Sequence, residues 1–374
     1  MNQKRKILVV FGTRPEAVKM APVVKQLRGH SELAESRVCV TGQHREMLDQ
    51  VLEIFGLVPD YDLNIMSEDQ SLASVSARVL MGLDDVFENY QPDWVLVQGD
   101  TTTAMATSLA AFYRRIKVGH VEAGLRTYDK FQPFPEEINR QIVDALSDLH
   151  FAPTERACQN LRREGVPDST IRVTGNTVID AMLWIREHVR RFKPWLPEGL
   201  AQALPGNRLI LVTGHRRESF GAGLEQICLA IREIAERFRD VLIVYPLHLN
   251  PNVQEPVRRI LRGLERVMLV TPLPYATFAW LMDRCYLILT DSGGVQEEAP
   301  SLGKPVLVMR EVTERPEGIE AGNACLVGTE KERIVRETSR LLNDTAAYNA
   351  MAEARNPYGD GHAAERIVEA ILRR

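Results

Sequence analysis

The feature that most constrains the fold of this chain is an alternation of short apolar runs, rich in β-branched residues, with longer segments of helical period. Twelve such runs occur, at residues 7–11, 38–41, 94–98, 118–121, 149–152 and 171–174, and then at 209–213, 241–245, 267–271, 286–290, 305–309 and 325–327. Runs of this length, separated by helical segments, are typical of buried parallel strands joined by crossover helices. The alternation therefore predicts an α/β protein built on doubly wound parallel sheets.

The runs fall into two series, which predicts two domains. A chain of 374 residues is about twice the usual domain length. Between the series lie an amphipathic stretch at 178–191 and a proline-rich passage at 193–206, and we interpret the passage as the linker region. Because ligands of open α/β sheets bind outside the carboxyl ends of the strands, we expect a ligand in a cleft between the domains. Segments directly after strands are the candidate sites.

Composition excludes several classes of protein. The formal net charge of -4 argues against a nucleic-acid-binding surface. Five scattered cysteines, odd in number and without CxxC spacing, predict neither a disulfide framework nor a zinc site and favour a reducing compartment. Since no apolar run approaches the ~18 residues of a membrane span, we predict no membrane partner.

The first candidate site is the segment 12–19, GTRPEAVK, which follows the first apolar run. Gly12 allows a turn, and the proline suits the first turn of a helix. A helix N-terminus beside the two cations Arg14 and Lys19 suits a diphosphate. A capped helix with surface cations is the alternative interpretation.

Three carboxylates are candidates for acid–base chemistry. Asp100 and Glu122 follow adjacent predicted strands, so their side chains should converge at one edge of the sheet. Glu136 opens a predicted helix in the segment 133–140, PFPEEINR. Capping explains Asp100 equally well, and complementarity to the helix dipole explains Glu136.

Two segments of the second half suit a phosphate. The segment 213–219, TGHRRES, places His215 and two arginines after a strand, where they can meet an oxygen that becomes more negative as a bond breaks. In the segment 290–298, TDSGGVQEE, a hydroxyl and two glycines let the backbone approach a phosphate closely. Glu298 could accept both ribose hydroxyls, and Arg315 supplies another cation. A charged loop without a ligand is the alternative for the histidine segment.

Two further patterns are interpreted as coincidences. Residues 113–117 have the YxxxK spacing of nicotinamide-dependent sugar epimerases, but no glycine-rich dinucleotide loop follows the first run. Residues 60–62, DYD, fit a DxD metal pattern in a segment of low expected structure. We therefore predict no cofactor and no metal.

Seven segments, in order along the chain, carry a resemblance to a known family. They are FGTRPEAVKMAP at 11–22, TGQHREML at 41–48, GDTTT at 99–103, GHVEAGLRT at 119–127, GHRRE at 214–218, DSGGVQEEAP at 291–300 and NPYGDG at 356–361. Together they resemble the non-hydrolysing UDP-N-acetylglucosamine (UDP-GlcNAc) 2-epimerase family, essentially from end to end.

The resemblance implies a fold and an assembly. It implies the GT-B fold, with a Rossmann-like N-terminal domain at 1–173, to which the last helix at 358–374 returns, and a Rossmann-like, UDP-binding C-terminal domain at 174–357. It also implies a cytoplasmic homodimer.

The resemblance also implies site residues. The catalytic set, which also contacts the substrate, is Lys19, Asp100, Glu122, Glu136 and His215. The residues that hold UDP are Arg14, Ser292, Gly293, Gly294, Glu298 and Arg315, with Phe278 and the backbone near Leu273 against the uracil. In some relatives a second UDP-GlcNAc activates the enzyme, and the matching positions here are Gln43, His44, Gln70, Arg216 and His248. Asp69 stands where such relatives can carry arginine, which counts against activation.

The activity that the resemblance implies is reversible epimerisation of UDP-GlcNAc at C2 to UDP-N-acetylmannosamine (UDP-ManNAc), for surface polysaccharide synthesis. The C2 hydrogen is not next to a carbonyl, so elimination of UDP to a 2-acetamidoglucal and its re-addition is the expected route. We favour Asp100 as the base, with Glu122 and Glu136 in proton return or ring-cation stabilisation. The alternatives are a GT-B glycosyltransferase, a hydrolysing epimerase, a non-catalytic sugar-nucleotide sensor, and a relative acting on a 2,3-diacetamido uronic acid nucleotide.

Overall fold

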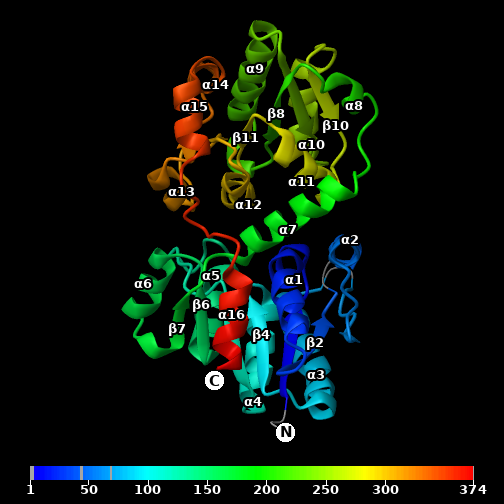
Figure 1. Ribbon diagram of the computed structural model, residues 1–374, viewed down its shortest axis with the longest axis vertical. Helices are drawn as coiled ribbons and strands as arrows, with labels where there is room; N and C mark the ends of the chain where they lie inside the picture. The colour runs from blue at the N-terminus through cyan, green and yellow to red at the C-terminus, as the bar shows by residue number, and fades with distance from the viewer. Residues whose placement is uncertain (1–3, 43–44, 68–69, 374) are drawn as a thin grey trace. The chain divides into compact units, whose positions relative to one another are not determined.

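The protein forms two compact units, shown in the computed structural model of Figure 1, which describes residues 4–42, 45–67 and 70–373. The first unit comprises residues 1–181 and 359–374, and the second comprises 182–358. Each unit is built on one sheet whose strand pairs are all parallel. The predicted class, α/β with doubly wound parallel sheets, is confirmed.

The sheet of the first unit has seven strands in the order β3-β2-β1-β4-β5-β6-β7. They are β1 (Arg5–Phe11), β2 (Ala34–Val40), β3 (Tyr61–Asp62), β4 (Trp94–Gln98), β5 (Lys117–Val121), β6 (Leu149–Ala152) and β7 (Ile171–Val173). All six runs predicted in this half are strands, and β3 is an additional one. Helices cover both faces of the sheet, which is why the central strands are apolar along their whole length.

The additional strand β3 contains part of the DYD pattern. Both carboxylates of the pattern accept backbone hydrogen bonds. Asp60 accepts from the Val38 N–H of β2 at 2.8 Å, and Asp62 accepts from the Asn64 N–H at 3.0 Å in a local turn. Within the described residues, no group of three or more His, Cys, Asp or Glu side chains is arranged to hold a metal ion.

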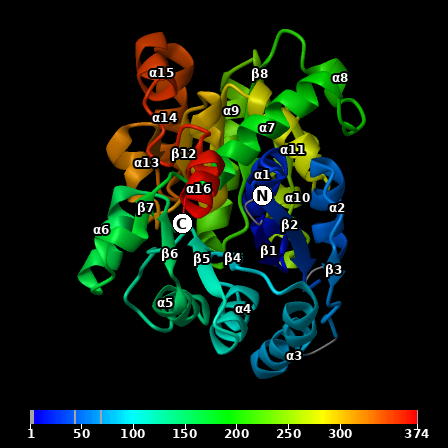
Figure 2. The ribbon, with the colours of Figure 1, turned by 60° about the horizontal axis from the view of Figure 1, so that its bottom comes forward.

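The helices of the first unit form two layers, one on each face of the sheet. They are α1 (Arg14–Gly29), α2 (Arg45–Phe55), α3 (Leu72–Tyr90), α4 (Thr102–Tyr113), α5 (Glu136–Leu146), α6 (Glu155–Arg163) and α16 (Ala363–Leu372), with a 3₁₀ turn at Asp168–Thr170. Helices α3, α4 and α5 pack side by side in one layer, and α2, α1 and α16 pack in the other (Figure 2).

The C-terminal helix α16 belongs to the first unit although it follows the whole second unit in the chain. It packs against α1 (Figures 1 and 2). Asp180 accepts hydrogen bonds from the N–H groups of Ala363 and Ala364, at 3.2 and 2.9 Å, and so caps the start of α16. At the other end of the helix, the Arg5 guanidinium donates to the carbonyl of Ile371. The helix is therefore fastened to this unit at both ends.

The sheet of the second unit has six strands in the order β10-β9-β8-β11-β12-β13. They are β8 (Arg208–Thr213), β9 (Val241–Pro246), β10 (Val267–Val270), β11 (Leu287–Thr290), β12 (Val306–Val308) and β13 (Ala324–Leu326), which match the six predicted runs of this half.

The helices of the second unit also cover both faces of their sheet. They are α8 (Leu200–Ala203), α9 (Ala222–Arg237), α10 (Pro251–Leu261), α11 (Tyr275–Arg284), α12 (Gly293–Glu298), α13 (Pro316–Ala321), α14 (Lys331–Asn343) and α15 (Thr345–Ala352), with 3₁₀ turns at Arg217–Ser219 and Ala299–Leu302. Helices α10, α9 and α14 pack together and enclose the main apolar core of this unit with the sheet.

The division between the units falls inside helix α7 (Thr177–Arg191), between Ala181 and Met182. The proline-rich passage 193–206 lies within the second unit and does not connect the two, since the Thr277 hydroxyl donates to the carbonyl of Trp195 at 2.6 Å. Proline-rich composition therefore marked a surface segment. Helix α7 makes the first connection between the units, and the chain returns to the first unit between Tyr358 and Gly359. No helix in the described part of the chain is long and apolar enough to cross a membrane.

Candidate active site

The strand order locates the candidate site of each unit. The order changes direction between β1 and β4 in the first unit and between β8 and β11 in the second. At such a switch point the loops after the two strands diverge and leave room for a ligand. The predicted segments 12–19 and 99–103 follow β1 and β4, and 213–219 and 290–298 follow β8 and β11. Each sheet therefore carries two of the four segments at its switch point.

The turn after β1 is closely packed and can hold only glycine. A Cβ atom on Gly12 would lie 2.1 Å from Thr41 Oγ1 and 2.6 Å from Thr103 Oγ1. The buried carboxylate of Glu16 accepts from the N–H groups of Gly12 and Thr13, at 3.1 and 2.8 Å. Burial raises the pKa of Glu16, although these hydrogen bonds oppose the effect. The segment is thus a capped helix start whose first backbone N–H groups are bound by the buried Glu16 carboxylate.

The two cations of this segment lie in the first turns of α1. Arg14 is the first residue of the helix, and Lys19 forms an ion pair with Glu122, which follows β5. The Lys19 and Glu122 side chains are 14% and 8% exposed. Glu122 adopts a φ of 69°, in the left-handed region that residues with a side chain seldom occupy. Such strain concentrates at functional sites.

The other two predicted carboxylates are placed by α5 and the end of β4. Asp100 and Glu122 follow neighbouring strands that pair in register, as predicted. The Arg140 guanidinium binds the Asp100 carboxylate at 2.5 Å, and the Asn139 side-chain amide donates to the Asp100 carbonyl at 2.9 Å. Glu136 begins α5, one turn before Arg140. Sequence reasoning assigned no role to Asn139 or Arg140, although both lie in the segment that contains Glu136.

In the second unit a buried aspartate shapes the histidine loop. Asp291 follows β11 and is 1% exposed. Its Oδ2 accepts from the backbone N–H groups of His215 and Arg216, at 2.6 and 2.7 Å. The Tyr245 hydroxyl donates to the Gly214 carbonyl at 2.9 Å. Sequence reasoning included Asp291 in a motif without a role, and the signal it missed was an acid directly after a buried strand.

The environment of His215 favours its neutral form. Burial lowers the pKa of His215, and the attraction of the Asp291 carboxylate, 3.4 Å away, opposes this shift only in part. The His248 and Arg216 side chains lower the pKa further. The His248 ring stacks on His215 with centroids 5.4 Å apart and an interplanar angle of 12°. A neutral imidazole can donate one hydrogen bond to a phosphate oxygen.

The two glycines after β11 are not explained by the protein's own packing. Among the described atoms, a Cβ on Gly293 would meet nothing closer than the Arg216 guanidinium, and one on Gly294 nothing closer than the Ser292 hydroxyl, both at 4.0 Å. Neither glycine has a positive φ. A remaining physical reason for glycine at these two positions is the close approach of a ligand to the backbone.

Arg315 is held at the edge of the same region. It forms an ion pair with Glu297 of α12, and its carbonyl accepts from the Tyr358 hydroxyl at 3.1 Å. The same hydroxyl accepts from the Gly318 N–H at 3.0 Å, at the start of α13. The segment 356–361 therefore supports a predicted UDP-binding residue, a function that its sequence did not indicate.

The remaining predicted UDP residues are partly buried. Glu298 ends α12, Leu273 lies in the loop between β10 and α11, and Phe278 lies in the first turns of α11. All three belong to the second unit, whereas Arg14, also predicted to hold UDP, lies in the first.

The residues predicted for a second UDP-GlcNAc are only partly described. Gln43 and His44 lie outside the described residues, as does Asp69. Gln70 lies in the first unit, whereas Arg216 and His248 lie in the second.

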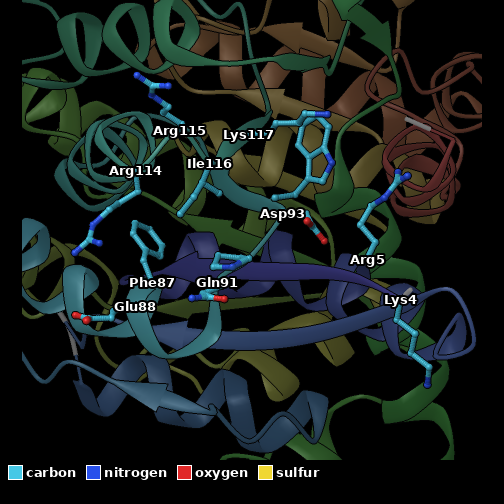
Figure 3. Close-up of a pocket in the computed structure, with 12 residues that line it drawn as sticks. Lys4, Arg5, Phe87, Glu88, Gln91, Asp93, Arg114, Arg115, Ile116 and Lys117 are labelled. Carbon is cyan, nitrogen blue, oxygen red and sulfur yellow. The ribbon is translucent and has the colours of Figure 1, made fainter. Parts of the chain in front are cut away.

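A large cavity lies elsewhere in the first unit, at the amino ends of β1, β4 and β5. Its volume is about 860 Å³, and its lining includes five cations: Lys4, Arg5, Arg114, Arg115 and Lys117. Figure 3 shows the charged ends of Lys4, Arg5, Arg114 and Arg115 spread apart rather than converging. Arg114 and Arg115 directly follow α4, where the helix dipole alone favours cations. The candidate site therefore stays at the carboxyl ends of the strands.

Comparison with known proteins defines first the class of fold. A glycosyltransferase from Streptomyces nogalater, SnogD, is 17% identical with a TM-score of 0.63 over 99% of both chains, and it shares the fold alone. The chain has the two-sheet GT-B architecture of such enzymes.

The family follows from closer relatives. The family model described as UDP-N-acetylglucosamine 2-epimerase matches residues 25–372. The UDP-N-acetylglucosamine 2-epimerase of Escherichia coli (strain K12) is 58% identical over 98% of both chains. A crystal structure of UDP-GlcNAc 2-epimerase from Neisseria meningitidis bound to UDP-GlcNAc is 49% identical, with a TM-score of 0.89, and the match covers 99% of this chain and all of that one. This chain belongs to the UDP-N-acetylglucosamine 2-epimerase family, a family of isomerases.

Proposed function

We propose that this protein reversibly converts UDP-GlcNAc to UDP-ManNAc by inverting C2 while the sugar remains a UDP sugar at the start and end of each turnover. The observation that carries the proposal is the pair of carboxylates, Asp100 and Glu122, that follow adjacent strands and are each held by a cation. Arg140 holds Asp100, and Lys19 holds Glu122. Two positioned carboxylates at one sheet edge are suited to removing and returning a proton.

The chemistry of the substrate explains why the second unit is needed. The C2 hydrogen is not adjacent to a carbonyl, so its removal cannot give an enolate. If the C1–O bond loosens first, positive charge on C1 acidifies the C2 hydrogen, and loss of both groups gives a 2-acetamidoglucal. UDP then adds back to C1 as a proton adds to the opposite face of C2. The protein must therefore hold the departing UDP and handle a proton at the same time.

We assign these tasks to different units. In the first unit Asp100 is the base, and Glu122 and Glu136 return the proton or stabilise the ring cation, with Lys19 beside them. Acid–base help of this kind typically contributes ~10²–10⁴-fold. A preorganised electrostatic donor contributes ~10²–10³-fold, so neither effect alone would carry the rate.

In the second unit the diphosphate would meet neutral His215 and the backbone at Ser292, Gly293 and Gly294. The lack of any packing need for the two glycines supports this assignment. Arg315 would add positive charge, and so would Arg14 from the first unit. Glu298 would bind the ribose, and Phe278 and the backbone near Leu273 would face the uracil.

We further propose a homodimer that supplies ManNAc units for surface polysaccharides from a reducing compartment such as the cytoplasm. The five cysteines are free thiols, which agrees with such a compartment. Sedimentation velocity tests the dimer. The initial rate on UDP-ManNAc, with and without added UDP-GlcNAc, tests whether a second molecule activates the enzyme.

An NMR time course of UDP-GlcNAc in deuterated water tests the activity. We expect UDP-ManNAc to form without any acceptor, with deuterium at C2 of both sugars. Free ManNAc as the main product would identify a hydrolysing epimerase. No conversion without an acceptor would favour a glycosyltransferase, and binding without turnover would favour a sensor.

Positional isotope exchange tests the elimination step. An ¹⁸O label in the bridge between C1 and the β-phosphorus should scramble to non-bridging positions during turnover, because UDP leaves and returns. Retention of the label in the bridge would rule out elimination.

A further inference from the structure

A buried histidine on β5, close in sequence to the candidate site, has no part in the proposed mechanism. His120 lies on β5, two residues before Glu122, and its side chain is fully buried. Its Nε2 lies 2.8 Å from the carbonyl oxygen of Gly99, and its Nδ1 lies 2.6 Å from Oδ1 of Asp144 on α5. It thus links helix α5 to the residue directly before Asp100.

Both partners of the His120 ring are hydrogen-bond acceptors. The Gly99 carbonyl can only accept a hydrogen bond, so Nε2 carries a proton. Burial alone would raise the pKa of Asp144, but His120 and Arg126 outweigh it and the pKa is lowered, so the carboxylate is ionised and also only accepts. Charge-assisted hydrogen bonds of this kind are stronger than neutral ones.

The contacts of Asp144 continue to two further charged side chains. Arg126 binds Oδ2 of Asp144 at 2.6 Å and also binds Glu164 at 2.6 Å. The Arg126 side chain is 0% and that of Asp144 3% exposed. Glu164, Arg126, Asp144 and His120 therefore form a chain of polar contacts that ends on the Gly99 carbonyl.

Holding this carbonyl orients Asp100. A peptide unit is planar, so fixing the Gly99 carbonyl fixes the plane that carries the Asp100 nitrogen and Cα. Gly99 has a φ of +70° and, as a glycine, can turn easily if it is released. On the other side of Asp100, Asn139 holds the next carbonyl and Arg140 holds the carboxylate. All three supports come from α5, the first of them through His120.

We propose that His120 and Asp144 are positioning residues that aim the Asp100 carboxylate, an inference that rests on the proposed function for its effect on catalysis. Neither residue touches substrate. We call the contacts from Asp144 through His120 to the Gly99 carbonyl the clamp. A displacement of the base by about 1 Å can cost ~10²-fold in rate, so loss of the clamp should lower kcat far more than it changes KM.

Two substitutions of His120 separate its two hydrogen bonds. A glutamine amide can take the place of Nε2, and an asparagine amide the place of Nδ1. His120→Gln should keep the bond to Gly99, whereas His120→Asn should keep the bond to Asp144 and release Gly99. We expect His120→Asn to lose roughly 10²-fold in kcat with little change in KM. We expect His120→Gln to recover most of that loss.

His150 provides the matched control. It is the residue opposite His120 on the neighbouring strand β6, is 3% exposed, and bonds the backbone carbonyl of Asp144 at 2.9 Å. His150→Asn loses the Nε2 bond to this carbonyl, so it should lower the Tm as His120→Asn does but leave kcat near that of the unsubstituted protein. Equal losses of kcat in His120→Gln and His120→Asn, or in His150→Asn and His120→Asn, would overturn the proposal.

A spectroscopic test does not depend on the activity. The sequence contains two Gly-Asp pairs, 99–100 and 359–360. Protein labelled with ¹³C-carbonyl glycine and ¹⁵N-aspartate therefore gives two correlations, one at the clamp and one as an internal reference. His120→Asn should shift the 99–100 correlation and leave 359–360 in place, and His120→Gln should shift it less. If the 99–100 correlation does not shift in His120→Asn, the proposal that His120 positions Asp100 is wrong. If it shifts as expected but the unsubstituted protein does not convert UDP-GlcNAc, only the proposed function is rejected.

Discussion

The strand-end sites of the two units occupy the same place in sheets of the same kind but differ in chemistry. In the first unit the loops after β1, β4 and β5 present carboxylates held by cations, as in the Asp100–Arg140 and Lys19–Glu122 pairs. In the second unit the loops after β8 and β11 present glycines, a histidine whose pKa is lowered by burial, and arginines. Strand order sets where each site lies, and the few residues after each strand set what it can do.

The difference teaches how the work of the proposed reaction can be divided. Carboxylates would repel a departing diphosphate, and an anion-binding loop would be a poor proton acceptor, so one sheet end could not easily do both. If the division is correct, substitutions of the carboxylates in the first unit should affect proton transfer, and substitutions in the loops of the second unit should affect nucleotide binding, with Arg14 as the nucleotide contact from the first unit.

The largest expected effect is that of Asp100→Asn. The amide cannot act as a base, so C2 deuterium incorporation and kcat should fall ~10²–10⁴-fold, while the affinity for UDP, measured by calorimetry, should stay the same. Asp93→Asn is the control. Asp93 lies at the amino end of β4, at the other end of the strand from Asp100, so this variant should keep normal activity. Near-normal exchange in Asp100→Asn would remove Asp100 as the base.

Arg315→Ala should weaken the binding of UDP, which Asp100→Asn should leave unchanged. Loss of a charge-assisted contact to the nucleotide should weaken UDP binding roughly 10- to 100-fold, because such bonds contribute about 1.5–3 kcal/mol. Arg336→Ala removes an exposed surface pair on α14 and serves as the control. Unchanged UDP affinity in Arg315→Ala would contradict its assignment to the nucleotide.

A pair of glycine substitutions compares how tightly the turns after β1 and β8 are packed. Gly12→Ala places a Cβ 2.1 Å from Thr41 Oγ1, and Gly214→Ala places one 2.8 Å from the Tyr245 hydroxyl. Overpacking costs about 1–3 kcal/mol, so Gly12→Ala should lower the Tm more than Gly214→Ala does. Gly29→Ala meets nothing within 4 Å among the described atoms and should not lower it. The opposite order would mean that the turn after β1 can relax.

The smallest expected effect concerns the protonation of His215. Its pKa is lowered in the folded protein, so between pH 6.5 and that lower value the unfolded chain binds a proton that the folded chain does not. Stability should therefore fall slightly as the pH falls through this window, and His215→Asn should remove the dependence. NMR titration should show a pKa below 6.5 in the free protein and a higher one with UDP, whose charge favours imidazolium. A value of 6.5 or above without UDP would contradict the buried, neutral donor.

The sequence by itself determined the strands and the segments that follow them. All twelve apolar runs became strands, because a strand covered by helices on both faces must be apolar along its length. The motif residues could be found for a related reason: a turn directly after a buried strand has few residues, so its glycines, acids and histidine are prominent in the sequence. Family resemblance then predicted the GT-B fold, and the structural comparison confirms it.

Only the tertiary structure decided which charges meet. Lys19 lies 103 residues from Glu122, and Asp100 lies 40 residues from Arg140, so no local spacing could pair them. The clamp from Asp144 to Gly99, the short strand β3 and the division of the units inside α7 are likewise absent from the sequence pattern. Hydrophobic periodicity and turn chemistry act over a few residues, whereas hydrogen bonds and ion pairs form between whatever side chains the folded sheet brings within about 3 Å.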